Sequence, residues 1–175
     1  MKRNHDMIRS ALYTLLTTAI TCLSAHAQIT PACPNSSVPG SSLCESSCVL
    51  CNIDGYTGIN NGTSPDGDNI CGQIVLQNPN WFGFIAGSSE IGFSITNSNC
   101  NYGFGLQAAI FQSCGEDALI CNPGTGMSGV PVDIAYFQFE PGQTYYLMID
   151  GFTGDVCNFG IEVTFGSVSP LPPGQ

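Results

Sequence analysis

Basic side chains are almost absent from this 175-residue chain, which has three Lys and Arg and two His against 13 Asp and Glu. All five basic residues precede position 27, so residues 28–175 contain none. Without Lys or Arg the chain cannot neutralise phosphates or anionic lipids, which excludes nucleic acid and anionic membranes as partners. Without His or Lys, Ser-His-Asp, Cys-His, Schiff-base and His-zinc chemistries each lack a required member. Catalysis would have to use carboxylates, tyrosines or a hard metal.

Helical periodicity is also lacking after the first segment, and that segment has the pattern of an export signal. Lys2, Arg3 and Arg9 precede an apolar run at 11–23 and a small-residue cleavage site at 25–27. The run is too short to span a bilayer as a retained helix. Removal of residues 1–27 leaves 148 residues with a formal charge of −12, since only Asp6 is lost among the acidic residues. We therefore expect a secreted or cell-surface protein with one domain.

Cysteine, by contrast, is abundant: the chain has ten, and nine follow the signal. In an exported protein these predict structural disulfides. The Cys48-x-x-Cys51 pair also suggests zinc or a redox motif, but no second CxxC or His accompanies it. Because nine is an odd number, one thiol is free, one pairs between chains, or one bridge is missing. The cysteines expected in bridges are Cys48, Cys51, Cys71, Cys100, Cys114, Cys121 and Cys157.

Two pairings stand out. Cys114 and Cys121 flank a short acidic loop, which favours a local bridge between them. Cys100 and Cys157 are placed to tie strand ends together. The remaining pairings stay open, because several cysteines allow many connectivities.

Seven short runs of β-type residues recur between Gly, Asn, Pro and Asp clusters and predict strands at 71–77, 81–86, 91–96, 104–112, 132–139, 144–150 and 159–165. Several alternate apolar and other residues, which marks a buried face. The apolar sets are Ile91, Phe93 and Ile95; Leu106, Ala108 and Ile110; Tyr145, Leu147 and Ile149; and Phe159, Ile161, Val163 and Phe165. These features predict an all-β fold, an antiparallel, jelly-roll-like β-sandwich stapled by disulfides.

The domain organisation follows from composition. After the signal (1–27) we expect a Cys-, Pro- and Ser-rich arm (28–47), the β-sandwich (48–167) and a Pro-rich linker or tail (168–175). The tail suggests that the chain is part of a larger exported protein. The Pro-Gly turn at 140–143 predicts a hairpin that joins the strands at 132–139 and 144–150.

Aspartates in Gly- and Asn-rich turns are the candidate metal ligands, and calcium is the ion that they would hold. The segments 53–58 and 149–154 differ only by Tyr for Phe and place Asp54 and Asp150 before a glycine. Asp66 and Asp68 alternate in an oxygen-rich loop, as calcium prefers, although the EF-hand pattern fails. The alternative is turn chemistry on an acidic, soluble surface.

The candidate carbohydrate-binding residues are aromatic side chains that would stack on sugar rings, with Trp81 and Tyr56 foremost. The alternative is core burial, the commoner fate of aromatics on alternating strands. A glycosidase would require two carboxylates flanking a cleft, and no spacing among the acidic residues singles out such a pair.

Several motifs occur in order along the chain: residues 48–58 (CVLCNIDGYTG), Cys71-Gly72, residues 81–87 (WFGFIAG), residues 105–107 (GLQ) and residues 145–151 (YYLMIDG). Over roughly 48–167 the chain resembles a cysteine-containing β-sandwich module of large exported proteins of marine Bacteroidota, which often occurs beside PKD-like repeats and type IX secretion sorting tails. The resemblance implies a secreted or surface module for adhesion, and it supplies no catalytic residues.

The sequence thus favours a non-catalytic extracellular module that binds a polysaccharide or a surface protein. A calcium-dependent carbohydrate-binding module and a carboxylate-based hydrolase are the alternatives.

Overall fold

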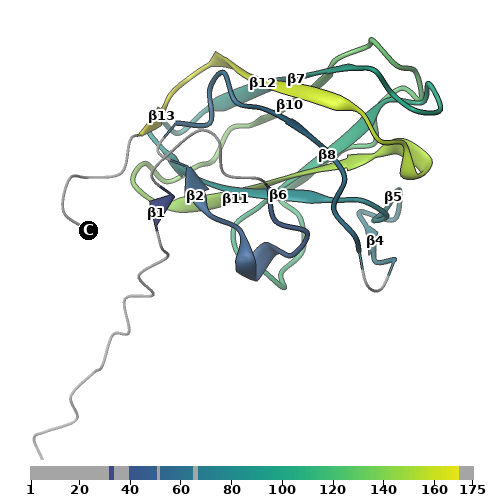
Figure 1. Ribbon diagram of the computed structural model, residues 1–175. Coiled ribbons are helices and arrows are strands. Elements are labelled where there is room, and N and C mark those ends of the chain that lie inside the picture. The colour runs from purple at the N-terminus through teal and green to yellow at the C-terminus, as the bar shows by residue number, and fades with distance from the viewer. Residues whose placement is uncertain (1–31, 34–39, 51, 65–66, 170–175) are drawn as a thin grey trace, which may run out of the picture.

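Two β-sheets packed face to face form the molecule. The computed structural model describes residues 32–33, 40–50, 52–64 and 67–169. Sheet A has the strand order β1-β2-β6-β11-β8-β9, with β13 also paired to β6; sheet B has the order β10-β7-β12-β3. Figure 1 shows sheet B above sheet A, with a small β4-β5 hairpin at one end. The predicted antiparallel β-sandwich is confirmed.

The strands of sheet A are β1 (Ala32–Cys33), β2 (Val49–Leu50), β6 (Asn80–Ala86), β11 (Thr144–Gly151), β8 (Leu106–Phe111), β9 (Ile120–Asn122) and β13 (Val168–Ser169). Those of sheet B are β10 (Val132–Tyr136), β7 (Ile91–Ser98), β12 (Asn158–Phe165) and β3 (Thr57–Ile59). The hairpin consists of β4 (Asn69–Ile70) and β5 (Ile74–Val75). All pairings are antiparallel except those of β2 with β1 and β6. Apart from two 3-10 turns, the described residues contain no helix, and none that could cross a membrane.

Alternating side chains fill the space between the sheets, as the period-2 pattern predicts. The apolar sets at 91–95, 106–110 and 145–149 are all buried in one cluster. At its centre, the Phe84 ring packs edge-on against Phe93 and Phe139, with centroids 5.1 and 5.8 Å apart. The core is therefore a single aromatic and aliphatic layer shared by both sheets.

The fourth predicted apolar set is only partly buried. Phe159 and Ile161 lie in the core, but Phe165 is 41% exposed. A β-bulge between Val163 and Phe165 shifts the register against β7. Because the side-chain period is 2, one extra residue turns Phe165 to the outer face.

The predicted hairpin at 140–143 is wrong. The Gln143 amide does close the turn on Glu140, at 3.1 Å, but β10 belongs to sheet B and β11 to sheet A. The turn therefore carries the chain from one sheet to the other. Local turn chemistry predicts a reversal, and which sheet receives the next strand depends on long-range packing.

The predicted strand at 71–77 is also shorter than expected. Cys71 and Gly72 adopt positive φ angles of 54° and 67°, which places a turn between β4 and β5.

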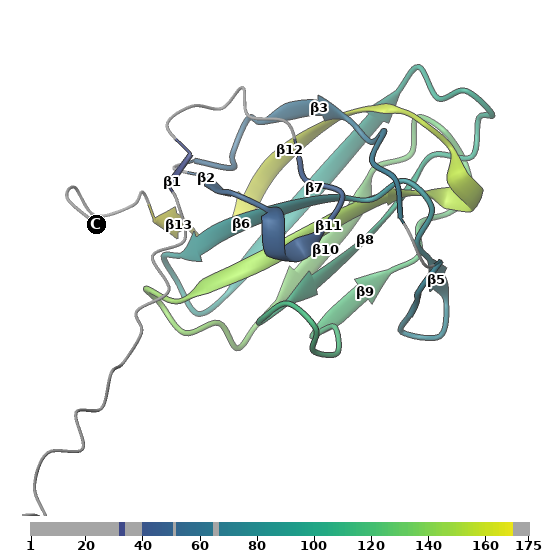
Figure 2. The same cartoon turned by 60° about the horizontal axis from the view of Figure 1, so that its bottom comes forward.

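The outer face of sheet A is covered. The 3-10 turn η1 (Cys44–Ser46) lies across it, as Figure 2 shows, and residues of the β4-β5 hairpin flank it. A second apolar cluster is buried beneath them, formed by Cys44, Ile74, Leu76, Trp81, Ala109, Phe111 and Met148. Residues 40–47 thus pack as part of the folded unit.

Disulfides fasten this covering layer. Cys44 pairs with Cys114 and Cys71 with Cys121, across sequence separations of 70 and 50. The predicted local Cys114–Cys121 bridge is therefore wrong. Cys100 pairs with Cys157, the other pairing that the sequence suggested. Cys48 is also disulfide-bonded, and Cys51 lies outside the described residues.

Candidate functional site

Asp150, one of the predicted calcium ligands, is completely buried at the end of β11. Its Oδ1 accepts the backbone N–H groups of Asn78 at 2.7 Å and Gln77 at 3.3 Å, and its Oδ2 accepts Gln107 Nε2 at 2.7 Å. Burial raises the pKa of this carboxyl above its ordinary value, and these hydrogen bonds partly offset that effect. Its oxygens thus accept hydrogen bonds from the chain itself.

Asp155 is a second buried carboxylate, which the sequence analysis did not single out. Its Oδ1 accepts the Tyr102 N–H at 2.9 Å, while Oδ2 accepts those of Phe104 at 2.6 Å and Gly105 at 3.2 Å. Its backbone carbonyl accepts Asn60 Nδ2 at 2.8 Å. Asp155 thus holds the loop at 99–105 in place at the end of the sandwich. Its donors lie about 50 residues away in the sequence, so no local pattern could have revealed the role.

Of the other predicted calcium ligands, Asp54 and Asp68 lie within the described residues. Asp54 accepts a hydrogen bond from the Val163 N–H at 2.8 Å. Val163 lies on β12 past the residues that pair with β3, so Asp54 provides a partner for an amide that β3 does not reach. Asp68 is exposed, and Asp66 lies outside the described residues. Within the described ranges, three potential metal ligands come together only at Cys100, Asp155 and Cys157, where the two sulfurs form a disulfide.

The predicted carbohydrate-stacking rings are buried. Tyr56 is 4% exposed and packs on Phe82 in the main core, with ring centroids 4.8 Å apart. Trp81 is 7% exposed and packs on Phe111 at 4.8 Å in the cluster under η1. Trp81 also borders a hollow of about 370 Å³ that is lined by Glu45, Asp68 and Glu116. In this structure neither ring offers an open face to a sugar.

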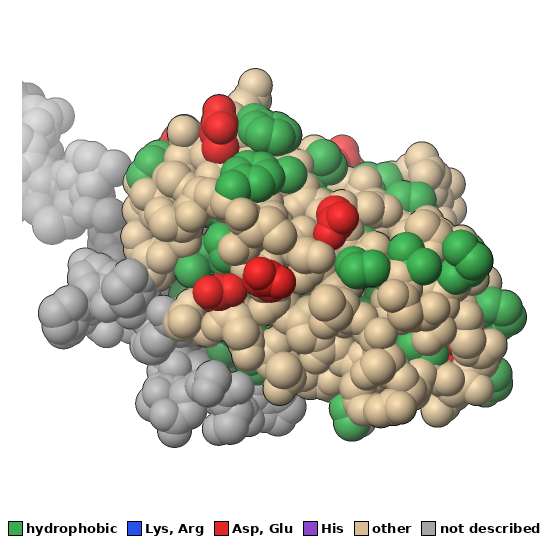
Figure 3. Space-filling view, turned by 90° about the horizontal axis from the view of Figure 1, so that it is seen from above, with side chains coloured by type: hydrophobic (Ala, Val, Ile, Leu, Met, Phe, Trp, Pro, Cys, Tyr) green, Lys and Arg blue, Asp and Glu red, His purple; other side chains and the backbone are tan. Residues whose placement is uncertain are grey.

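The outer face of sheet B, in contrast, is not covered by any described segment. Because residues paired across strands point to the same side, the register assigns four rows to this face. We call them the aromatic row (Phe165, Gly92, Ala135), the acidic row (Glu162, Ser94, Asp133), the glycine row (Thr57, Gly160, Thr96) and the polar row (Ile59, Asn158, Ser98). Figure 3 looks down on this side and shows hydrophobic and acidic side chains among polar ones, with no basic side chain.

A hollow of about 540 Å³ occupies the half of this face formed by the glycine and polar rows. Gly160 lies in the middle of its row, where the missing side chain lowers the surface between Thr57 and Thr96. Hydroxyl and amide groups of the two rows line the hollow, together with the 47%-exposed Ile59, and none of its lining residues is charged.

The other half of the face carries two exposed rings. Phe137, which follows β10, is 59% exposed and stacks on Phe165, with centroids 5.8 Å apart and planes at 21°. The Phe165 ring lies over Gly92, where an added Cβ would collide with it. In the neighbouring row, Ser94 Oγ donates to Asp133 at 2.7 Å. This part of the surface thus combines aromatic and acidic groups.

No protein-family model matches this chain, and no curated protein matches it. Among solved structures, it is similar to the pre-peptidase C-terminal domain of a collagenase from Bacillus anthracis, with a TM-score of 0.39 and 16% identity. That likeness covers 63% of this chain and 90% of the other. A likeness at this level says nothing about ligand or activity, and the resemblance to a Bacteroidota surface module stays a prediction.

Proposed function

We propose that this protein is a secreted, non-catalytic binding module whose ligand-binding surface is the outer face of sheet B. The main observation behind this proposal is that the outer face of sheet A is covered, whereas no described segment covers that of sheet B. Sheet A has its outer face buried under η1 and the β4-β5 hairpin, which disulfides fasten, whereas sheet B presents four rows of side chains to solvent. Exposed apolar patches rimmed by polar groups mark interaction sites.

The buried carboxylates support a binding role over a catalytic one. Asp150 and Asp155 each accept three hydrogen bonds from the chain's own N–H groups, so both act as structural acceptors. A general acid or base instead requires a carboxyl placed to exchange a proton with a substrate. The disulfides support an extracellular location, because such bridges persist in oxidising compartments.

An extracellular polysaccharide or a surface protein is the proposed partner. The uncharged hollow over Gly160 favours a neutral carbohydrate, since hydroxyl and amide groups match sugar hydroxyls. Calcium dependence remains a prediction. The exposed carboxylate of Asp68 is the described group that would bind the ion.

Retention of the oxidised protein on immobilised polysaccharides and on surface proteins, with calcium and then with EDTA, tests this function. We expect saturable retention by at least one member of the panel, and its loss after reduction and unfolding. Retention lost in EDTA would add a calcium requirement. Absence of retention throughout, or saturable hydrolysis of a panel member, would overturn the proposal.

A further inference from the structure

Two aromatic rings lie exposed at the end of sheet B where β7 begins. A bulge in β12 turns Phe165 outward, and Phe137 stacks against it. Both rings keep about half of their surface in water. An exposed ring pair on an otherwise polar face is a site for contact with another molecule.

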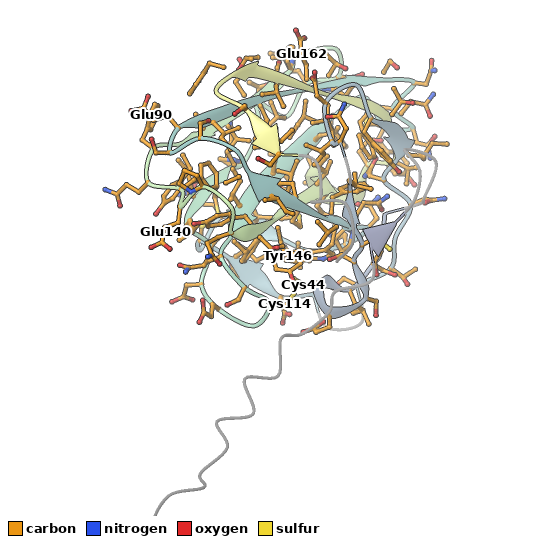
Figure 4. The ribbon with its side chains drawn as sticks, turned by 90° about the vertical axis from the view of Figure 1, so that its left-hand side faces the viewer. Cys44, Glu90, Cys114, Glu140, Tyr146 and Glu162 are labelled. Atoms are coloured by element: carbon orange, nitrogen blue, oxygen red, sulfur yellow. A yellow bond between two sulfur atoms is a disulfide. The ribbon has the colours of Figure 1, made fainter. Side chains whose placement is uncertain are left out.

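Two carboxylates lie in the row next to this ring pair, and others lie at the same end of the chain's fold. Glu162 and Asp133 occupy the adjacent row, roughly 7 Å further along the strands. Glu90 directly precedes β7, and Figure 4 places Glu90 and Glu140 at the same end of the molecule, with Glu162 on the outer side of sheet B. No described residue carries a positive charge, so nothing in the described part of the chain neutralises this cluster.

Charge and shape together define what would fit. A cation above an aromatic ring face is attracted by the ring quadrupole, and neighbouring carboxylates add charge-assisted hydrogen bonds. Arg suits both contacts, because its planar guanidinium stacks on rings and donates a fork of N–H groups.

The same features count against other occupants. A second copy of the exported chain would bring acidic side chains and no cation to this face. Anionic polysaccharides would be repelled, and a neutral sugar would leave the carboxylates without charged partners.

We infer that the aromatic and acidic rows, with Phe137, bind Arg side chains of a partner protein. This inference rests on the proposed function, and it names the partner's chemistry for one half of the sheet B face. The hollow over Gly160 at the other half remains available to a different group of the same or another ligand.

Fluorescence anisotropy with a labelled peptide of alternating Arg and Gly, about 12 residues long and in about 0.15 M salt, tests this inference. We expect the oxidised protein to bind this peptide more tightly than its Lys counterpart. The double variant Phe137→Ala/Phe165→Ala should lose about tenfold in affinity, and Glu162→Gln/Asp133→Asn about fivefold.

Matched controls separate this site from general attraction to an acidic protein. Glu116→Gln/Asp117→Asn removes the same charge from an exposed loop near the opposite face, and Tyr102→Ala removes a 68%-exposed ring from the loop end. Both should change affinity less than about twofold. Equal losses in the two charge-matched pairs, or no binding of the Arg peptide, would overturn the inference. Retention on the polysaccharide and protein panel in that case would leave the proposed function standing.

Discussion

Replacement of Asp155 by Ala should destabilise the protein severely. The carboxylate accepts three backbone N–H groups of the 99–105 loop, at 2.6, 2.9 and 3.2 Å, and it is completely buried. Each hydrogen bond to a charged acceptor contributes about 1.5–3 kcal/mol, and unpaired buried donors carry a desolvation penalty. Because this loop reaches the surface, water will replace part of what is lost. We expect a decrease of about 3–5 kcal/mol in the free energy of unfolding.

Such a decrease is a large fraction of the about 5–15 kcal/mol that stabilises a typical domain. It corresponds to a fall of about 10 °C in Tm for a chain of this size. Asp155→Asn should also destabilise, because its amide nitrogen would face an N–H donor. Equilibrium unfolding of the oxidised protein in guanidinium chloride measures both effects.

Glu162→Ala, at an exposed position on β12, is the matched control and should leave the unfolding midpoint unchanged. A loss below about 1 kcal/mol for Asp155→Ala, or one equal to the control, would refute the assignment of Asp155 as the acceptor that holds the loop.

Two further predictions concern the buried polar and covalent elements. Because the folded pKa of Asp150 is raised, its favourable contribution is present below the ordinary value of 3.8 and is lost as pH rises through the folded pKa. Asp150→Asn should therefore gain stability relative to the wild type between pH 4 and pH 7, measured by urea unfolding at several pH values; a difference that stays constant or reverses would contradict this sign. Replacing Cys71 and Cys121 by Ser should lower the free energy of unfolding by about 2–5 kcal/mol and increase amide exchange in β4 and β5, whereas unchanged exchange there would show that the bridge does not hold the hairpin.

Local sequence patterns predicted the strands well because each of the main strands turns one face to the core between the sheets. The sets at 91–95, 106–110 and 145–149 alternate with a period of 2, because every second side chain points into the core. Phe165 broke the pattern because a bulge is set by the register between β12 and β7, which lies outside any local window. The turn at 140–143 was predicted correctly, but the sequence did not show that it joins a strand of sheet B to a strand of sheet A. Which sheet a strand joins depends on contacts between residues that are distant in the sequence.

The candidate site was harder to predict, because its hydrogen bonds and packing contacts join residues that are distant in the sequence. The Asp-Gly echo at 54 and 150 suggested a shared ion, yet Asp54 caps an amide of β12 and Asp150 binds donors over 40 residues away. Trp81 and Tyr56 were chosen as large aromatics, and packing buried both. The exposed rings on the outer side of sheet B are Phe137 and Phe165, which no spacing distinguished from core residues.

Amide hydrogen exchange of the oxidised protein, alone and with a ligand retained in the panel, tests most directly whether the outer face of sheet B is the binding surface. The proposed function predicts ligand-dependent protection in β7 and β12, with no change in η1 or in the β4-β5 hairpin. Protection centred on η1 and the hairpin instead would place binding on the sheet A side and contradict the proposal.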